Sequence, residues 1–331
     1  NASLFANSSG RGLYVGSRLI MPTAYITHSD FYKHLTPMGH PEQVDRLRVI
    51  EDALAKPNFD TLLRISAPVG TMDQVELCHP QDYVLQIKNA CPSHGYVNLD
   101  GDTHVSVGSF DAAMRAVGGV CSAIDLVMGG EAYNAFCATR PPGHHAETNK
   151  SMGFCLFGTV SIGAKYAIRK YGLSRIAIID FDVHHGNGTQ DLVWNDPNIM
   201  FVTSQQIPLW PGTGEVSEIG AHNNVINLPL KKYSSGAELM AAYQHSIFPK
   251  LAVYKPEILL ISAGFDAHIN DPLANLNFST EDFKDITKML CEFADNHCHG
   301  RVVSTLEGGY DLPSLADSVA AHVNVLMEHA K

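Results

Sequence analysis

The sequence predicts an α/β fold in which helices flank a largely parallel sheet within a single domain. Short apolar runs of strand type alternate with longer segments of helical periodicity along most of the 331 residues. Strands that alternate with helices in this way usually pair in parallel. The length permits one large domain or two small ones. No linker, internal repeat or low-complexity segment divides the chain, which favours one domain.

The composition is that of a globular protein, with 45% hydrophobic and 17% charged residues. No run of about 18 apolar residues occurs, so a membrane-spanning helix is excluded. The net charge of −11 argues against a nucleic-acid-binding surface. It could attract cationic substrates, although solubility alone is the commoner reason for such a charge. The seven cysteines form no CxxC pair, which indicates reduced thiols and a cytoplasmic location.

The first 20 residues are set apart from the domain, which we place at 21–331. Residues 1–22 contain no Asp or Glu but include Arg11 and Arg18, as in some organelle-targeting segments. We interpret 1–20 as an N-terminal extension, either a transit segment or an artificial one. Met21 would be a natural start, and import into an organelle remains open.

Periodicity and turn residues predict the elements in order. The expected strands are 23–28, 133–139, 176–179, 199–204, 257–262 and 301–306. The expected helices are 42–54, 82–90, 110–128, one ending near 171, 236–252, 280–295 and one from about 314. Residues 98–104 are expected to form a polar loop. Arg46 and Arg48 lie on the first helix, where either is open to interpretation as a solvated charge.

The stretch 176–190, IAIIDFDVHHGNGTQ, carries the strongest chemical signal. Its apolar start suits a strand covered on both faces, and Asp180, Asp182, His184 and His185 follow at once. Alternate side chains of an extended chain project to the same side, which would group Asp180, Asp182 and His184. Carboxylate and imidazole ligands suit zinc. A polar loop without a metal is the alternative.

Polar clusters follow three other expected strands directly. His144 and His145 come after 133–139, Asp266 after 257–262, and Tyr310 after 301–306. Ligands of open parallel sheets bind outside the carboxyl ends of the strands. These clusters are therefore expected to converge in one cleft.

Asp182, His184 and Asp266 would supply three zinc ligands and leave the fourth position open, as in catalytic rather than structural sites. Adjacent histidines can serve as base and acid. The Tyr310 hydroxyl could stabilise a developing oxyanion, a contribution of about 3 kcal/mol. This set fits zinc-assisted amide hydrolysis. As alternatives, Asp266 could cap a helix and Tyr310 could be a buried aromatic.

Seven motifs together resemble the superfamily of histone deacetylases, acetylpolyamine amidohydrolases and acetoin-utilisation proteins, most closely its class II branch and bacterial relatives. They are HPEQVDRL (40–47), RPPGHHA (140–146), MGFC (152–155), DFDVHHGNGTQD (180–191), PGTG (211–214), SAGFDAH (262–268) and LEGGYD (306–311). The resemblance covers residue 23 to the end of the sequence. It implies the arginase-deacetylase fold, with a parallel sheet of about eight strands.

The resemblance also implies residue roles. One zinc ion per chain would sit on Asp182, His184 and Asp266. His145 would be the general base and acid, His144 an electrostatic partner paired with Asp180, and Tyr310 the hydroxyl that polarises the carbonyl. A structural K⁺ or Na⁺ would use Asp180, Asp182, His184, Thr203 and Ser204.

For the substrate, the resemblance implies a narrow acyl-lysine tunnel lined by Gly153, Phe154 and Trp210, with Leu273 at its side. Gly308 and Asp102 complete the substrate-binding set. Asn187 would be the partner of His145; because it is neutral, we expect a lower His145 pKa than an aspartate would give. Arg46 matches an arginine near an internal product channel of some relatives.

The leading hypothesis is a zinc-dependent deacetylase of acetylated lysine side chains in proteins or peptides. An acetylpolyamine or small-acylamide deacetylase is the alternative: Leu273 replaces an acidic gatekeeper of vertebrate polyamine enzymes, but Asp100 and Asp102 could take that part. A catalytically silent acyl-lysine binding protein and a two-metal ureohydrolase remain more distant. The oligomeric state, a homo-oligomer included, is left open.

Overall fold

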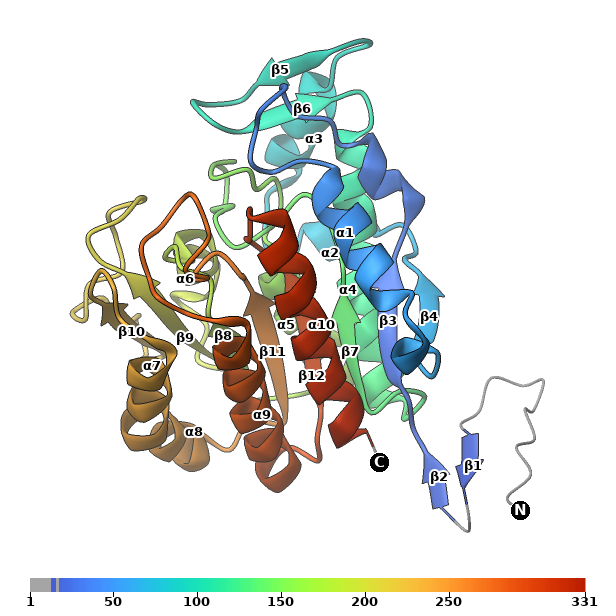
Figure 1. Ribbon diagram of the computed structural model, residues 1–331. Helices are drawn as coiled ribbons and strands as arrows, with labels where there is room; N and C mark the ends of the chain where they lie inside the picture. The colour runs from blue at the N-terminus through green and yellow to red at the C-terminus, as the bar shows by residue number, and fades with distance from the viewer. Residues whose placement is uncertain (1–12, 16–17, 331) are drawn as a thin grey trace.

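An eight-stranded parallel sheet forms the centre of the protein (Figure 1). The computed structural model describes residues 13–15 and 18–330. The strand order is β10-β9-β8-β11-β12-β7-β3-β4, and every neighbouring pair is parallel. The strands are β3 (Thr23–Thr27), β4 (Leu63–Ser66), β7 (Asn134–Cys137), β8 (Ile176–Asp180), β9 (Ile199–Gln206), β10 (Val225–Leu230), β11 (Ile258–Ala263) and β12 (Val302–Leu306).

Helices cover both faces of the sheet. In the view of Figure 1, α1 (Asp45–Leu54), α9 (Thr280–His297) and α10 (Leu312–His329) lie in front of it, and α4 (Ser109–Met128) and α5 (Thr159–Tyr171) lie behind. None of the described helices is long and apolar enough to cross a membrane. The remaining helices are α2 (Met72–Val75), α3 (Gln81–Ala90), α6 (Asn187–Val193), α7 (Gly236–Ala242) and α8 (Phe248–Tyr254), with short 3₁₀ turns at Ser29–Lys33 and Pro57–Phe59.

The predicted fold class is confirmed, and all six strands expected from the sequence are present. Strands β7, β8, β11 and β12 are buried at every residue, which is why they appear in the sequence as unbroken apolar runs. The two strands missed from the pattern, β4 and β10, lie at the edges of the sheet. Intermediate and exposed residues alternate along β4, and β10 mixes buried with less buried residues, so neither is buried throughout.

The expected loop at 98–104 is present at 99–103, and its two end residues belong to an antiparallel pair, β5 (Tyr96–Asn98) and β6 (His104–Ser106). Two other features differ from the expectation. The expected helix at 236–252 is interrupted by a π-helical turn at Tyr243–Ile247. The chain after Gly186 forms helix α6, which the sequence analysis did not anticipate.

Most of the expected 1–20 extension lies outside the described residues. The parts that are described, β1 (Leu13–Val15) and β2 (Arg18–Ile20), form an antiparallel pair separate from the main sheet (Figure 1). The interpretation of 1–20 as an extension stays a prediction.

The register of the sheet brings the strand ends level. Asp180 of β8 pairs with Thr203 on one side and with Ser262 on the other, and Ser262 pairs with Thr305 of β12, which pairs with Cys137 of β7. Four chain segments therefore leave the sheet at the same edge and the same height. The loops that follow them carry the polar clusters noted in the sequence.

A buried histidine joins two of the front helices, α9 and α10, to the sheet. His322 of α10 bonds through Nε2 with the Ser304 hydroxyl of β12 at 2.9 Å and through Nδ1 with the Thr287 hydroxyl of α9 at 2.7 Å. Burial lowers the pKa of His322 from 6.5 to about 3. Between these pH values the unfolded chain binds a proton that the folded chain does not, so the free energy of unfolding falls as the pH drops through this window.

We predict that His322→Gln weakens this pH dependence, because glutamine does not titrate. For the wild type, this one histidine should lower the free energy of unfolding by about 2 kcal/mol between pH 7 and pH 5. Urea unfolding at the two pH values measures the difference. The same change at the exposed His94 is the control. A pH dependence equal in His322→Gln and the wild type would contradict the assignment.

Candidate active site

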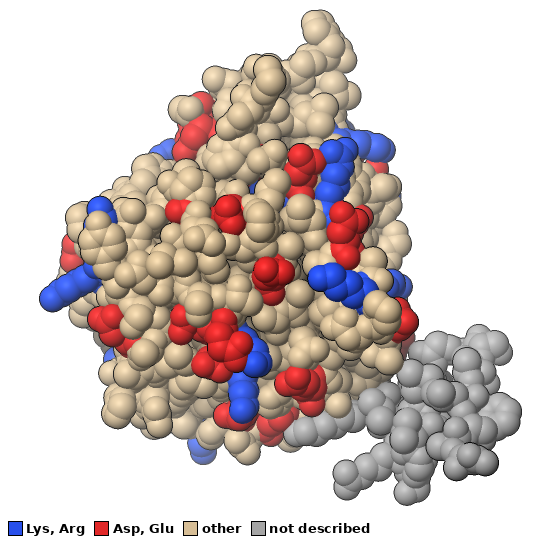
Figure 2. Space-filling model, viewed as in Figure 1, with Lys and Arg blue, Asp and Glu red and all other residues tan. Residues whose placement is uncertain are grey.

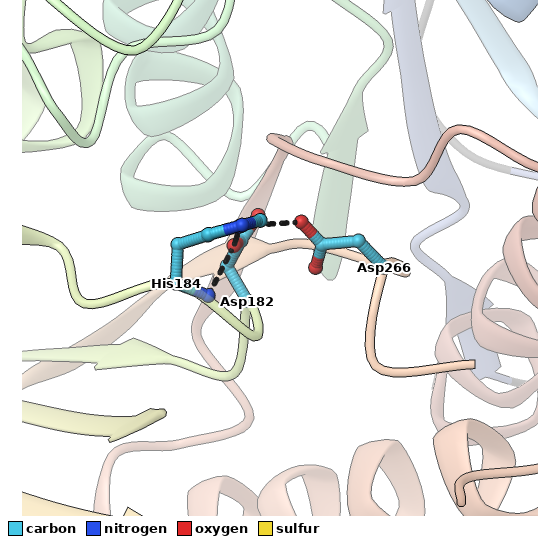
Figure 3. A group of neighbouring side chains, drawn as sticks. All are labelled: Asp182, His184 and Asp266. Carbon is cyan, nitrogen blue, oxygen red and sulfur yellow. Dashed lines mark hydrogen bonds and ion pairs between the residues drawn. The ribbon is translucent and has the colours of Figure 1, made fainter. Parts of the chain in front are cut away.

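Three side chains from two loops meet at the carboxyl edge of the sheet (Figure 3). Asp182 and His184 follow β8, and Asp266 follows β11. One ligand atom from each lies within 4.8 Å of those of the other two, and all three residues are buried. His184 Nδ1 is 3.0 Å from Asp266 Oδ2 and 3.3 Å from Asp182 Oδ1. Among the described residues this is the one such group with the ligand types and spacing of a metal site.

The backbone holds the two carboxylates in place. The N–H of Gly308 donates to Asp182 Oδ2 at 2.8 Å, and the N–H of Val183 donates to Asp266 Oδ1 at 2.9 Å. A Cβ atom on Gly308 would lie 2.2 Å from Asp266 Oδ2. Glycine is therefore required at this position, because any side chain would displace the carboxylates.

The electrostatics of the group favour a cation. Burial raises the pKa of Asp266, the neighbouring Asp182 carboxylate raises it further, and the value reaches about 7 despite the opposing effect of His184. Burial alone would lower the pKa of His184, but its bonds with Asp182 and Asp266 outweigh this and raise it to about 10. Two carboxylates and one imidazole fit a zinc ion and leave a ligand position free.

His144 lies beside this group and is held by acidic partners. Its Nδ1 is 2.9 Å from Asp180 Oδ2, and its backbone N–H donates to Glu307 Oε2 at 3.1 Å. Burial would lower the pKa of His144, but the charges of Asp182, Asp180 and Glu307 outweigh it and raise the pKa well above its ordinary value. His144 and Asp180 are thus paired as expected.

His145 has the opposite character. Its ring centroid lies 3.9 Å from that of His144, and its Nδ1 is 2.7 Å from Asn187 Oδ1. Burial lowers the pKa of His145 well below its ordinary value, and the charges of His144 and His184 lower it further. The side chain is therefore neutral at neutral pH and free to accept a proton.

Tyr310 is held from both sides. Its backbone N–H donates to Asp271 Oδ2 at 2.7 Å, and the guanidinium of Arg46 lies 5.0 Å from its ring centroid. Arg46 is fully buried and donates to the carbonyls of Gly309 and Glu307, so its interpretation as a solvated charge was wrong. Burial raises the pKa of the Tyr310 hydroxyl, as do nearby carboxylates, and it remains protonated.

A cavity of about 240 Å³ opens beside these groups. It is lined by Asp102, His145, Gly153, Phe154, His184, Leu209, Trp210, Leu273 and Tyr310. Five of the six residues expected to bind substrate therefore line one cavity. The sixth, Gly308, lies against the carboxylates of Asp266 and Asp182 instead. Leu209 was not anticipated, although it adjoins Trp210.

The residues expected at a second cation site are also neighbours. Thr203 pairs with Asp180 across β8 and β9. The Ser204 hydroxyl donates to the Asp180 carbonyl at 3.3 Å, and the Thr203 hydroxyl donates to Gln205 Oε1 at 3.2 Å. Ion binding at this place stays a prediction.

Two buried acids that support the site were missed in the sequence. Glu307 accepts hydrogen bonds from the backbone of Gly143 and His144 and from the Ser262 hydroxyl, and burial raises its pKa to about 7. Asp271 binds the backbone of Tyr310 and Leu273. Glu307 follows β12 directly, in the same position relative to its strand as the other polar clusters, and could have been identified from this.

Comparisons with known proteins identify the family of this chain. The histone deacetylase domain family matches residues 40–326. An uncharacterized protein of Synechocystis sp. is 40% identical over 308 residues, 92% of this chain and 99% of that protein. The chloroplastic histone deacetylase 10 of Oryza sativa is 37% identical over 302 residues, 85% of this chain and 68% of that protein. The crystal structure of the HDA15 HD domain superposes with a TM-score of 0.87 at 30% identity, covering 93% of this chain and 89% of that one. This chain belongs to the histone deacetylase family.

Proposed function

We propose that this protein is a zinc-dependent amidohydrolase that removes acetyl groups from lysine side chains of proteins or peptides. Membership of the histone deacetylase family supports hydrolysis of amides. The observation that carries the finer proposal is the shared cavity: His184 of the metal group, His145 and Tyr310 all line it. The cavity's other walls, which include Phe154, Trp210 and Leu273, suit the aliphatic part of a lysine side chain.

One zinc ion held by Asp182, His184 and Asp266 would act as a Lewis acid that polarises the amide carbonyl and acidifies water. His145, neutral and hydrogen-bonded to Asn187, accepts the proton of the attacking water and returns it to the leaving amine. His144, charged and paired with Asp180, stabilises negative charge. The Tyr310 hydroxyl donates a hydrogen bond to the developing oxyanion.

We also propose a structural K⁺ or Na⁺ beside Asp180. The polar atoms of Asp180, Thr203 and Ser204 are brought together by the β8–β9 register, and Asp182 and His184 follow in the same loop. Carbonyl, hydroxyl and carboxylate oxygens are the ligands that hard cations prefer.

An acetylated polyamine is the alternative substrate. The observation that favours it is Asp102, which lines the cavity and whose backbone N–H donates to Asp100 Oδ1 at 3.1 Å. A second ammonium group of a polyamine could pair with these acids. Leu273, also on the lining, offers no charge for such a group. A silent acyl-lysine binding protein would need only the cavity.

The surface and the cysteines bear on partners and location. Figure 2 shows Asp and Glu spread among Lys and Arg over the face of α1, α9 and α10, without a continuous basic patch. This supports a substrate other than nucleic acid. All seven cysteines are free, which supports a reducing compartment, either the cytoplasm or an organelle such as the one in the name of the Oryza sativa relative.

We predict zinc-dependent release of acetate from an acetyl-lysine peptide at a higher kcat/KM than from acetylputrescine. Tyr310→Phe should lower kcat by about a hundredfold, because it removes one oxyanion donor, and His145→Ala should abolish turnover. Metal analysis should give one zinc per chain. Absence of turnover on both substrates with zinc bound would contradict the proposal and favour the binding protein, whereas two manganese ions per chain would favour a ureohydrolase.

We predict that Gly153→Ala closes the cavity. The added Cβ would lie 2.4 Å from His145 Cδ2 and 2.6 Å from Trp210 Cη2, so kcat/KM should fall by about a hundredfold. Gly95→Ala is the matched control, because Gly95 has a similar φ of +69° but no atom within 4 Å of the added Cβ. Similar losses in both variants would show that backbone strain, rather than the cavity, is responsible.

A further inference from the structure

A chain of hydrogen bonds leads from His145 to an acid that lies outside the cavity. His145 Nδ1 is 2.7 Å from Asn187 Oδ1. The amide nitrogen of Asn187 donates in turn to Glu147 Oε1 at 2.8 Å and to the sulfur of Met152 at 3.4 Å. Asn187 is buried, while Glu147 is only partly so. The Glu147 carboxylate is therefore connected to the His145 imidazole through a single group, the Asn187 amide.

The direction of these hydrogen bonds determines which ring nitrogen of neutral His145 carries the proton. The oxygens of an ionised carboxylate and the sulfur of a thioether only accept hydrogen bonds, so the Asn187 amide must turn its nitrogen toward Glu147 and its oxygen toward His145. An oxygen at this position requires a proton on Nδ1 of His145. The neutral ring then has an unprotonated Nε2, which is the atom that can act as a base.

An asparagine without such an acceptor would not fix this arrangement. Its amide oxygen and nitrogen are nearly the same size, and a half-turn of the group exchanges them. In the turned state, the amide N–H groups would face Nδ1 of His145. They would stabilise the ring with its proton on Nε2, where it cannot accept another.

We propose that Glu147 is a positioning residue, which orients the Asn187 amide and thereby keeps the proton of His145 on Nδ1. The catalytic consequence of this inference rests on the proposed function, in which His145 is the base. Glu147 touches neither the cavity nor the metal group. It acts only through Asn187.

The loop of Glu147 is held to helix α6 by separate contacts. Asp191 of α6 accepts from the backbone N–H of Thr148 at 2.8 Å and from its hydroxyl at 2.7 Å. The N–H of Thr189 donates to the His144 carbonyl at 3.0 Å. A purely structural role in joining loop and helix is therefore shared with Asp191, and Asp191→Ala offers a matched control.

The test is a double-mutant cycle with an acetyl-lysine peptide as substrate. Glu147→Ala should lower kcat by about tenfold or more with KM and zinc content unchanged, and Glu147→Gln should lose less, because it keeps one acceptor. In the Asn187→Asp background, Glu147→Ala should cause no further loss, because either oxygen of a carboxylate accepts from Nδ1 and no orientation is needed. Asp191→Ala should lower the thermal unfolding temperature but change kcat less than twofold.

Two results would overturn the inference. One is an equal loss of kcat from Glu147→Ala in both backgrounds, which would indicate support of the fold alone. The other is a wild-type rate in Glu147→Ala. The tautomer can also be read directly from the ¹⁵N shifts of His145, with Nδ1–H expected in the wild type and a mixture in Glu147→Ala. An inactive wild type would therefore count against the proposed function, while the ¹⁵N spectrum would still decide the role of Glu147.

Discussion

Four buried carboxylates at one edge of the sheet impose the main physical constraint on this protein. Asp180, Asp182, Asp266 and Glu307 are all fully buried, and burial of unpaired charges would cost several kcal/mol for each. Backbone hydrogen bonds offset part of this cost, since each of the four carboxylates accepts one from a nearby N–H group. The charged His144 lies among them. The ends of β8, β11 and β12 are shaped by this requirement.

The two adjacent histidines, His144 and His145, differ in charge because their surroundings differ. His144 faces Asp180 and is charged, whereas His145 faces the amide of Asn187 and is neutral. Both rings are buried, and the charges around them separate their pKa values: carboxylates surround His144, whereas His145 lies beside His144 and His184. A pair of titratable groups whose surroundings move their pKa values apart is characteristic of acid–base sites. Burial and the charges of His144 and His184 lower the pKa of His145, whereas the hydrogen bond with Asn187 raises it. That an aspartate in place of Asn187 would give a higher pKa stays a prediction.

The fold and the grouping of the candidate ligands could be predicted from the sequence for one reason: in a parallel sheet, residues that follow strands come together. This rule places Asp182, His184 and Asp266 without any contact information. It fails where the pattern is weak. Strands β4 and β10 are half-buried edges, and helix α6 begins inside a stretch whose polar residues suggest a loop. Asp271 and Glu147 could not be found, because each acts on the backbone or side chain of a residue that only the folded loops bring near.

The level register of the strand ends has a consequence for how the protein folds. The residues of the site follow different strands of the sheet, between residue 144 and residue 310. No local segment contains both His145 and all three residues of the metal group. Such long-range contacts form late and slowly. A metal ion bound to Asp182, His184 and Asp266 would therefore stabilise the assembled sheet rather than any fragment of it. In this protein, an assembled site therefore indicates that the strands preceding its residues have reached their native order in the sheet.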